Sequence, residues 1–188
     1  DPDSGYVEEG FSESNTIANN SIWDEEVNGG AITYAGTYNM YCNREPRFYV
    51  TVSFNNSYFT QEKRLFQFFN GGRDNIHTHD APQNGYLIRK KISPKSNAKE
   101  GNFTYRPGIV YRLGEAYLNY AEALNECEPG NQQILTYLNK IRERAGVRQY
   151  TTGATDENFI HVNLSDQEEM RRLIHAERRV ELCCEGIR

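Results

Sequence analysis

The feature that most constrains the fold of this chain is a helical period of apolar side chains that begins near residue 111. In residues 111–126 the apolar side chains recur at steps of three and four, which predicts an amphipathic helix. Its buried face is expected to carry Leu113, Tyr117, Tyr120, Ala121 and Leu124. A helix with one apolar face must pack against another element. The sequence therefore predicts a layered helical structure in this part of the chain.

A second helix is predicted to form a hairpin with the first. The first helix stops at Glu128-Pro129-Gly130, Asn131 can cap the next helix, and Gly146 ends it. The apolar stripe of this second helix consists of Ile134, Leu135, Leu138, Ile141 and Ala145. The hairpin opens on Leu113-Gly114 and Tyr117, which match the start of a tetratricopeptide repeat. Since one repeat cannot bury its apolar face alone, its neighbours are expected in an amino-terminal part that this chain lacks.

A third helix is predicted from a capping box formed by Ser165 and Glu168. Its apolar stripe runs through Met170, Leu173, Ile174, Val180 and Cys184. Cys183 and Cys184 would lie on this helix, and they are interpreted as small apolar core residues rather than redox-active thiols. The four cysteines of the chain include no CxxC pair and no zinc-site spacing, so no metal is predicted.

The first 110 residues are predicted to be rich in loops with a few short strands. Residues 1–45 contain many Asn, Gly, Ser and Tyr residues and follow neither a helical nor a strand period. Strands are expected at Arg47–Phe54, Leu65–Phe69 and Tyr86–Ile92, and residues 93–108 are expected to form a polar loop. We interpret residues 1–110 and 111–188 as two regions of one truncated domain.

Composition narrows the classes of function. The chain is 37% hydrophobic but 12% aromatic, a balance typical of aromatic-rich polar loops on a modest core. The net charge of -5 argues against nucleic acid, which needs a clustered basic surface, and it also disfavours acidic glycans unless a local patch differs. The sequence has no apolar run of 18 residues and no signal region. Both ends are expected to have been cut from a longer protein.

Five motifs resemble the carboxyl-terminal part of the SusD/RagB family: NREPRFYVTV, GYLIRKKI, RLGEAYLNYAEALNE, LNKIRERAGV and ERRVELCCEGIR. The resemblance covers about residues 43–188. It implies a mostly α fold, a tetratricopeptide-like helical scaffold with long loops and a few short β-strands. It also implies a surface-exposed lipoprotein of the bacterial outer membrane, held there by an amino-terminal lipid anchor absent from this chain. Members of the family bind oligosaccharides or polysaccharides without cleaving them and deliver them to a SusC-like TonB-dependent transporter, and no cofactor is implied.

A glycan site is expected in the loops. A sugar ring offers a flat apolar face and a rim of hydroxyls, so its sites combine aromatic platforms with polar side chains. The candidates are Trp23, Tyr34, Tyr38, Asn39, Tyr41, Asn43, Arg73 and Asp74. Loop aromatics can instead simply pin loops to the scaffold. In the family, part of the glycan surface comes from the amino-terminal half of the protein.

Charged residues of the helices are interpreted as structural. The resemblance and the helical spacing favour a network of ion pairs formed by Arg142, Arg144, Glu177, Arg178 and Glu181, with Glu115 or Glu122 as further candidates. Such a network ties helices together and has no catalytic role. Removing one partner of a buried pair is expected to cost about 3 to 5 kcal/mol.

Two rival interpretations remain open. His77-Thr78-His79-Asp80 could contribute metal ligands, but the motif lies in a polar stretch and is better interpreted as a solvated turn. No serine elbow, phosphate loop or Cys-His arrangement indicates an enzyme. The alternative to glycan binding is a protein or peptide interaction module on the tetratricopeptide scaffold, which would use an apolar helical groove rather than an aromatic surface.

Overall fold

The structure of the chain is a computed structural model that describes residues 8–17, 29–75 and 81–187. The chain divides into two compact units. The loop-rich unit contains Asp1–Arg44 and Phe48–Arg106, and the helical unit contains Glu45–Arg47 and Pro107–Arg188. Within the described ranges, no helix is both long enough and apolar enough to cross a membrane.

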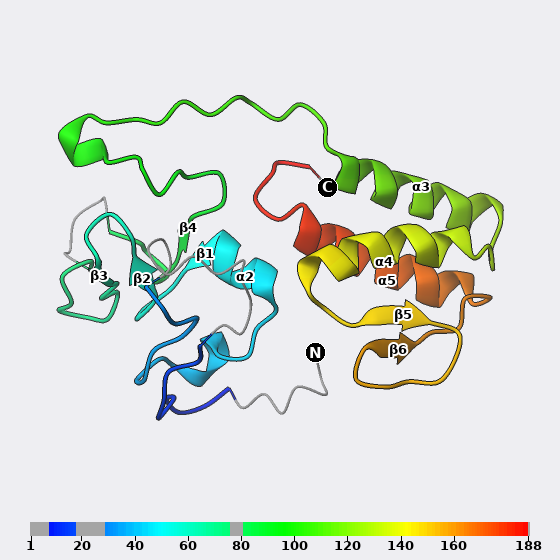
Figure 1. Ribbon diagram of the computed structural model, residues 1–188, viewed down its shortest axis with the longest axis horizontal. Coiled ribbons are helices and arrows are strands. Elements are labelled where there is room, and N and C mark those ends of the chain that lie inside the picture. The colour runs from blue at the N-terminus through cyan, green and yellow to red at the C-terminus, as the bar shows by residue number, and fades with distance from the viewer. Residues whose placement is uncertain (1–7, 18–28, 76–80, 188) are drawn as a thin grey trace. The chain divides into compact units, whose positions relative to one another are not determined.

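Helices α3 (Leu113–Cys127), α4 (Gln133–Ala145) and α5 (Gln167–Glu181) form the helical unit, and α3 contacts both of the others (Figure 1). The hairpin of α3 and α4 is the one that the sequence predicted. Gly146 ends α4 in the left-handed conformation with φ of 69°, a conformation that glycine adopts without a steric cost.

The core of the helical unit lies between the facing sides of these helices. The stripe predicted for α4 is confirmed, because all five of its residues are buried. The stripe predicted for α3 was partly wrong. Leu118 and Ala121 are fully buried, whereas Leu113 and Tyr120 are 63% and 44% exposed. The buried face of α3 also includes two polar residues, Glu115 and Asn125. A pattern of apolar residues alone therefore does not identify this face correctly.

The two ends of α5 differ from the prediction. Asp166 rather than Ser165 is the N-cap, and its carboxylate accepts hydrogen bonds from the amides of Glu168 and Glu169 at 3.1 and 3.0 Å. The helix ends at Glu181, so Cys183 and Cys184 are not helical. Cys184 is exposed with φ of 61°, and the core position is taken by Leu182, which is 2% exposed. The two cysteines are therefore not core residues of a helix.

Two short parallel strands complete the helical unit. Strands β5 (Gln149–Thr151) and β6 (Phe159–His161) pair in the register Tyr150 to Ile160. The side chain of Asn139 on α4 holds β5 in place, because it both donates to the carbonyl and accepts from the amide of Tyr150, at 2.8 and 2.7 Å. The sequence did not predict this pair, whose strands are only three residues long.

A buried network of ion pairs ties α5 to other parts of the helical unit. The carboxylate of Glu177 contacts Arg47 at 2.6 Å and Arg142 at 2.5 Å. Glu181 contacts Arg47 at 3.1 Å, Arg112 at 2.5 Å, and Arg144. Glu177 and Glu181 are 3% and 4% exposed, so these charges are held away from water. We call these six residues the Glu177–Glu181 network.

The sequence interpretation omitted two members of this network, Arg47 and Arg112. They come from segments that the sequence had assigned to a strand and to the edge of the first helix. Arg178, which was also predicted to belong, donates to Asn119 at 2.6 Å and lies 3.9 Å from Glu122. These contacts join α5 to α3 through polar side chains.

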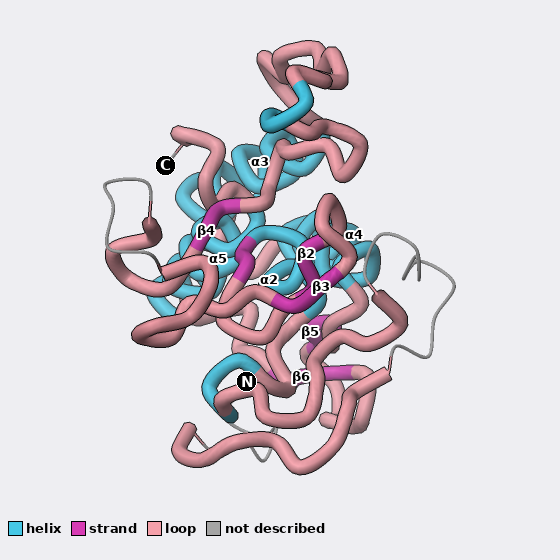
Figure 2. The backbone as a smooth tube through the Cα atoms, turned by 90° about the vertical axis from the view of Figure 1, so that its left-hand side faces the viewer, coloured by secondary structure: helices cyan, strands magenta, loops and turns pink. Residues whose placement is uncertain are grey.

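The loop-rich unit is built on two small antiparallel sheets, and Figure 2 shows that most of its path is loop. Strand β1 (Val52–Ser53) pairs with β4 (Leu87–Ile88), and β2 (Tyr58–Phe59) pairs with β3 (Arg64–Leu65). Short 3-10 helices lie at η1 (Asn39–Tyr41) and η2 (Ala98–Glu100). The strands predicted near residues 65 and 87 therefore exist, although each is shorter than expected.

The strand predicted at Arg47–Phe54 was wrong. Pro46–Thr51 forms a short helix, α2, and only Val52 and Ser53 are extended. Pro46 is the first residue of α2, a position where its fixed φ and missing amide hydrogen favour a helix. The ring of Phe48 on α2 stacks on Phe54 at 5.5 Å, so tertiary contacts override the β propensity of this aromatic run.

Candidate functional site

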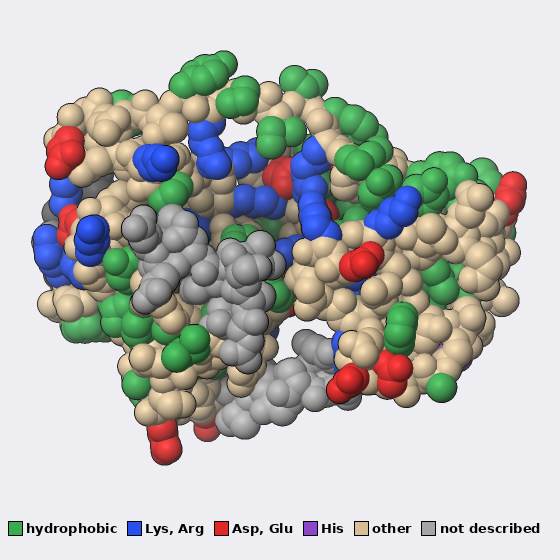
Figure 3. All heavy atoms as spheres, in the orientation of Figure 1, with side chains coloured by type: hydrophobic (Ala, Val, Ile, Leu, Met, Phe, Trp, Pro, Cys, Tyr) green, Lys and Arg blue, Asp and Glu red, His purple; other side chains and the backbone are tan. Residues whose placement is uncertain are grey.

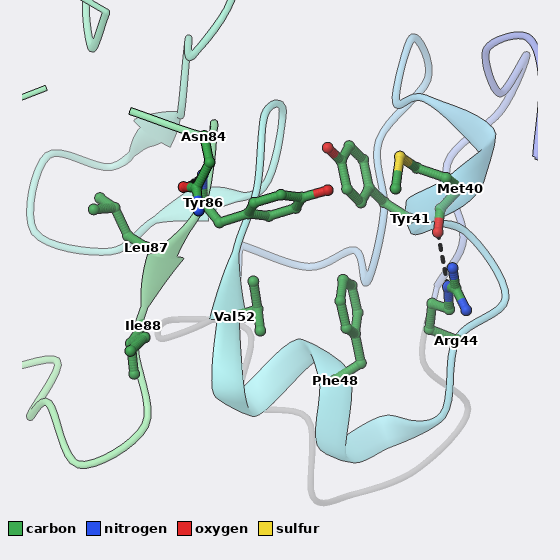
Figure 4. A pocket seen from close by; sticks show the side chains of 9 residues that line it. All are labelled: Met40, Tyr41, Arg44, Phe48, Val52, Asn84, Tyr86, Leu87 and Ile88. Atoms are coloured by element: carbon green, nitrogen blue, oxygen red, sulfur yellow. Dashed lines mark hydrogen bonds between the residues drawn. The ribbon is translucent and has the colours of Figure 1, made fainter. Parts of the chain in front are cut away.

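A pocket of about 400 Å³ opens on the surface of the loop-rich unit (Figure 4). Aromatic and aliphatic side chains form most of its wall, with a cation and an amide among them. The lining residues are Met40, Tyr41, Arg44, Phe48, Val52, Asn84, Tyr86, Leu87 and Ile88. We call this the aromatic pocket.

The aromatic wall is built on one buried ring. Phe54 is 1% exposed, and the rings of Tyr41 and Phe48 both stack on it, with centroid distances of 4.8 and 5.5 Å. Tyr86 meets Tyr41 edge to face at 5.8 Å, and Figure 4 shows its hydroxyl directed toward the Tyr41 ring. Stacked and edge-to-face contacts of this kind fix the orientation of each ring. The pocket therefore presents a preformed aromatic surface.

Local structure explains how residues distant in sequence meet here. Val52 pairs with Ile88 across β1 and β4, which brings the segment around Tyr86 to the α2 side of the pocket. Tyr49, buried on α2, accepts a hydrogen bond from the Arg44 amide at 3.0 Å and donates one to the Tyr41 carbonyl at 2.9 Å. Burial raises the pKa of Tyr49 to about 12, so this hydroxyl stays protonated and keeps its donor role.

Polar groups lie at the edge of the pocket. Arg44 is exposed, and its Nε donates to the Met40 carbonyl at 2.7 Å, which holds the guanidinium at the rim (Figure 4). Asn84, also exposed, supplies an amide that can both donate and accept. An apolar aromatic wall with a few polar groups at its edge is suited to bind a ligand. Across the described ranges, no three His, Cys, Asp or Glu side chains are grouped so that they could hold a metal ion.

Of the predicted binding residues that the structure describes, Tyr41 lines the aromatic pocket. Tyr38 lies next to it, with ring centroids 6.3 Å apart, and also meets Phe11 at 5.5 Å. Asn39 donates to the Glu9 carbonyl at 2.7 Å, so its amide helps to hold the amino-terminal loop. Trp23 lies outside the described residues.

The remaining candidates lie outside the lining. The Tyr34 hydroxyl donates to the Gly29 carbonyl within its own loop. Asn43 is exposed with φ of 54°, next to Arg44. The carboxylate of Asp74 accepts two hydrogen bonds from the guanidinium of Arg64, both at 2.6 Å. Those bonds outweigh burial and lower the pKa of Asp74, so Asp74 stays ionised and serves to hold its loop.

Arg73 belongs to a charged cluster on β3 and its neighbours. It lies 3.0 Å from the carboxylate of Glu62, which also contacts Arg64 at 2.7 Å and Lys99 at 2.5 Å. The hydrogen bonds from Lys99 and Arg64 lower the pKa of Glu62 to about 2. We call Glu62, Arg64, Arg73, Asp74 and Lys99 the β3 charge cluster.

Sequence reasoning missed most of the pocket, namely Met40, Arg44, Phe48, Val52, Asn84, Tyr86, Leu87 and Ile88. The Pro46 signal for a helix start could have found part of it, because it places Phe48 on a helix rather than on the strand that was predicted. The pairing of β1 with β4 has no such local signal. The motif His77–Asp80 lies outside the described residues, so the structure does not test a metal site there.

The comparisons with known proteins agree with one another. The family model described as the SusD family matches residues 3–188. SusD-like protein P2 from Formosa agariphila is 34% identical over 94 residues, which make up 48% of this chain and 16% of that protein.

Solved structures show the same fold. The crystal structure of a SusD-like protein from Bacteroides fragilis has 29% identity and a TM-score of 0.57, over 78% of this chain and 27% of that one. A second structure from the same organism, described as a SusD-like carbohydrate binding protein, has 21% identity and a TM-score of 0.59, over 97% of this chain and 33% of that one. The chain thus spans a third or less of the length of these relatives.

Proposed function

The chain belongs to the SusD family, and from this premise we propose that it binds oligosaccharides or polysaccharides through the aromatic pocket, without cleaving them. The observation that carries the proposal is a preformed aromatic surface, in which Tyr41 and Phe48 stack on the buried ring of Phe54 and Tyr86 meets Tyr41 edge to face. A pyranose ring can place its apolar C–H face against these rings, while its hydroxyls reach Arg44 and Asn84 at the rim.

The proposed setting is the surface of a bacterial outer membrane. There the protein would be held by a lipid anchor and would pass its ligand to a SusC-like TonB-dependent transporter. Family membership and the description of one structural relative as a carbohydrate binding protein support this setting. A capture protein needs affinity and access rather than acid and base groups, and an open, aromatic pocket supplies both.

Titration calorimetry of the full-length protein with a panel of polysaccharides and their oligomers tests the proposal. Tyr86→Ala is expected to weaken binding at least about tenfold, because an aromatic contact at the centre of a site contributes about 2 kcal/mol. Tyr105→Ala is the matched control, since Tyr105 is 87% exposed in the same unit and does not line the pocket. Sugar chains would be analysed afterwards for cleavage.

Saturable binding without cleavage that Tyr86→Ala weakens and Tyr105→Ala leaves intact supports the proposal. Equal binding by Tyr86→Ala and the unchanged protein would place the glycan elsewhere. Shortened sugar chains would contradict the non-catalytic role.

A protein or peptide ligand is the second candidate function, and the outer face of the helical hairpin favours it. Figure 3 shows apolar side chains gathered over α3. Leu113 and Tyr120 of α3 are exposed large apolar side chains, and the ring of Tyr120 meets Tyr137 of α4 at 4.8 Å. Apolar helical faces are the surfaces that tetratricopeptide scaffolds use to bind partners. Binding of a peptide that Tyr120→Ala weakens and Tyr86→Ala does not would favour this function.

A further inference from the structure

Two kinds of apolar side chain line the aromatic pocket. Three of its nine lining residues are aromatic, and four are aliphatic or carry a thioether: Met40, Val52, Leu87 and Ile88. An aromatic platform is sufficient to hold the flat face of a sugar ring. The aliphatic side chains add a surface that a stacked ring does not need. They therefore indicate a further apolar group on the ligand.

The aliphatic surface comes from the two strands at the pocket. Among the described residues that line it, Val52 belongs to β1, and Leu87 and Ile88 belong to β4. Val52 and Ile88 are direct partners in the antiparallel register, and directly opposed side chains lie on one face of a sheet about 5 Å apart. Figure 4 shows the Val52 side chain pointing from β1 toward the ring of Tyr86. We call Val52 and Ile88 the aliphatic pair.

The aliphatic pair is accessible to a ligand. Ile88 is 56% exposed, and Val52 is partly exposed. Apolar surface that faces water at a ligand pocket lowers the free energy of binding when an apolar group of the ligand covers it. A sugar hydroxyl in the same place would exchange its hydrogen bonds to water for contacts with side chains that have neither donors nor acceptors. The pair therefore favours a methyl group over a hydroxyl.

The volume of the pocket limits the size of the bound group. Its volume of about 400 Å³ is near the lower end of the roughly 300 to 1,000 Å³ that ligand sites span. Such a volume suits one sugar ring with a small substituent. The apolar group that meets the aliphatic pair is therefore a small one.

We propose that the aromatic pocket binds a pyranose ring that carries a methyl group, with the ring against Tyr41 and Tyr86 and the methyl group against the aliphatic pair. A 6-deoxy sugar, an O-methyl ether and an O-acetyl ester can each supply this methyl group. The inference rests on the proposed function and adds to it the class of sugar. Burial of the methyl group, together with the hydroxyl that no longer has to be desolvated, predicts about tenfold tighter binding than for the matching hydroxyl-bearing sugar.

Three matched pairs of sugars test the inference by titration calorimetry of the full-length protein. L-fucose against L-galactose tests the 6-deoxy group, and 6-O-methyl-D-galactose against D-galactose tests the ether. Acetylated glucomannan oligosaccharides against the same oligosaccharides after alkaline deacetylation test the ester. In at least one pair, the methyl-bearing member is expected to bind at least about tenfold more tightly than its partner. The three pairs show which source of the methyl group the pocket takes.

Two threonine substitutions locate the methyl group. Val52→Thr and Ile88→Thr place a hydroxyl in the aliphatic pair and keep a β-branched side chain. Each is expected to lower the affinity ratio within the preferred pair at least about threefold, because it weakens binding of the methyl-bearing member more than of its partner. Val50→Thr and Ile92→Thr are the matched controls. They make the same changes at residues that are 54% and 55% exposed in the same unit and do not line the pocket, so the ratio should not change.

Tyr86→Ala separates the methyl preference from glycan binding itself. It removes an aromatic contact that both members of a pair use, so both should lose affinity and their ratio should stay the same. Unfolding midpoints show which variants retain the fold. Because Ile88 is largely exposed, Ile88→Thr is expected to keep the midpoint of the unchanged protein.

Each outcome has a distinct meaning. Equal affinities within all three pairs, or equal ratios in Ile88→Thr and Ile92→Thr, overturn the methyl preference while the glycan-binding function stands. Binding of other glycans but of none of these pairs overturns it as well. No binding to these pairs or to the wider glycan panel contradicts the proposed function and this inference together.

Discussion

Glu181→Ala is expected to destabilise the helical unit by about 3 to 5 kcal/mol. Glu181 is 4% exposed, and its carboxylate contacts Arg47, Arg112 and Arg144. Removing the carboxylate leaves the largely buried guanidinium groups of Arg47 and Arg112 without this counter-charge. A buried charge without its partner costs far more than a surface pair contributes. Denaturant unfolding followed by far-UV circular dichroism measures the loss, because this unit contains most of the helix.

Glu143→Ala is the control, since Glu143 is an exposed residue of α4 and the change should alter the free energy of unfolding by no more than about 0.5 kcal/mol.

The pH dependence of stability gives an independent test. Burial alone would raise the pKa of Glu181, but the hydrogen bonds from Arg144, Arg112 and Arg47 lower it below the ordinary value of 4.5. The stabilisation is therefore complete above that value and is lost as the pH falls through the lower folded pKa. Glu181→Ala should lack this part of the acid dependence; an unchanged acid profile would contradict the network.

Phe54→Ala is expected to cost about 3 to 5 kcal/mol in the loop-rich unit and to abolish glycan binding. The ring is 1% exposed and supports Tyr41 and Phe48 from below. Its removal leaves a cavity and frees both rings, so the preformed surface is lost even though Phe54 does not line the pocket. Near-UV circular dichroism during unfolding reports on these aromatic contacts, and titration calorimetry reports on binding.

Phe69→Ala provides the comparison, because Phe69 is 55% exposed in the same unit and its truncation creates no buried cavity. It should change stability by less than about 1 kcal/mol and leave binding intact. If Phe54→Ala and Phe69→Ala had equal effects on binding, the aromatic pocket would not be the site.

Helices of the second unit could be predicted because their signals are local and repeated. The stripe of α4 and the breakers Pro129 and Gly146 fix its length and its buried face from sequence alone. The stripe of α3 was harder, since Glu115 and Asn125 share its buried face. At the start of α5 two capping residues stand next to each other, and the sequence does not say which one the backbone uses.

The loop-rich unit could not be predicted to the same degree. Its strands are two residues long and pair across gaps in sequence, and so they carry no usable period. The helix α2 was missed because aromatic residues favour a strand, although Pro46 indicated a helix start. The family resemblance predicted the mostly helical fold class correctly, and the SusD-like structures confirm it.

The site was predicted by kind of residue more than by position. Aromatic platforms in the loops were expected, and Tyr41 does line the pocket. Phe48 and Tyr86 come from segments interpreted as strands, and their approach depends on the pairing of Val52 with Ile88. Asp74 is of a residue type that often binds sugar hydroxyls, but its carboxylate already accepts two hydrogen bonds from Arg64. Which polar residues already have partners is a tertiary fact that sequence patterns do not contain.

A crystal structure of the full-length protein with a bound oligosaccharide tests the central claim most directly. We expect a sugar ring against Tyr41, Phe48 and Tyr86, with its polar groups at Arg44 and Asn84. A ring bound outside the aromatic pocket, for example on the outer face of α3 and α4, would contradict the account.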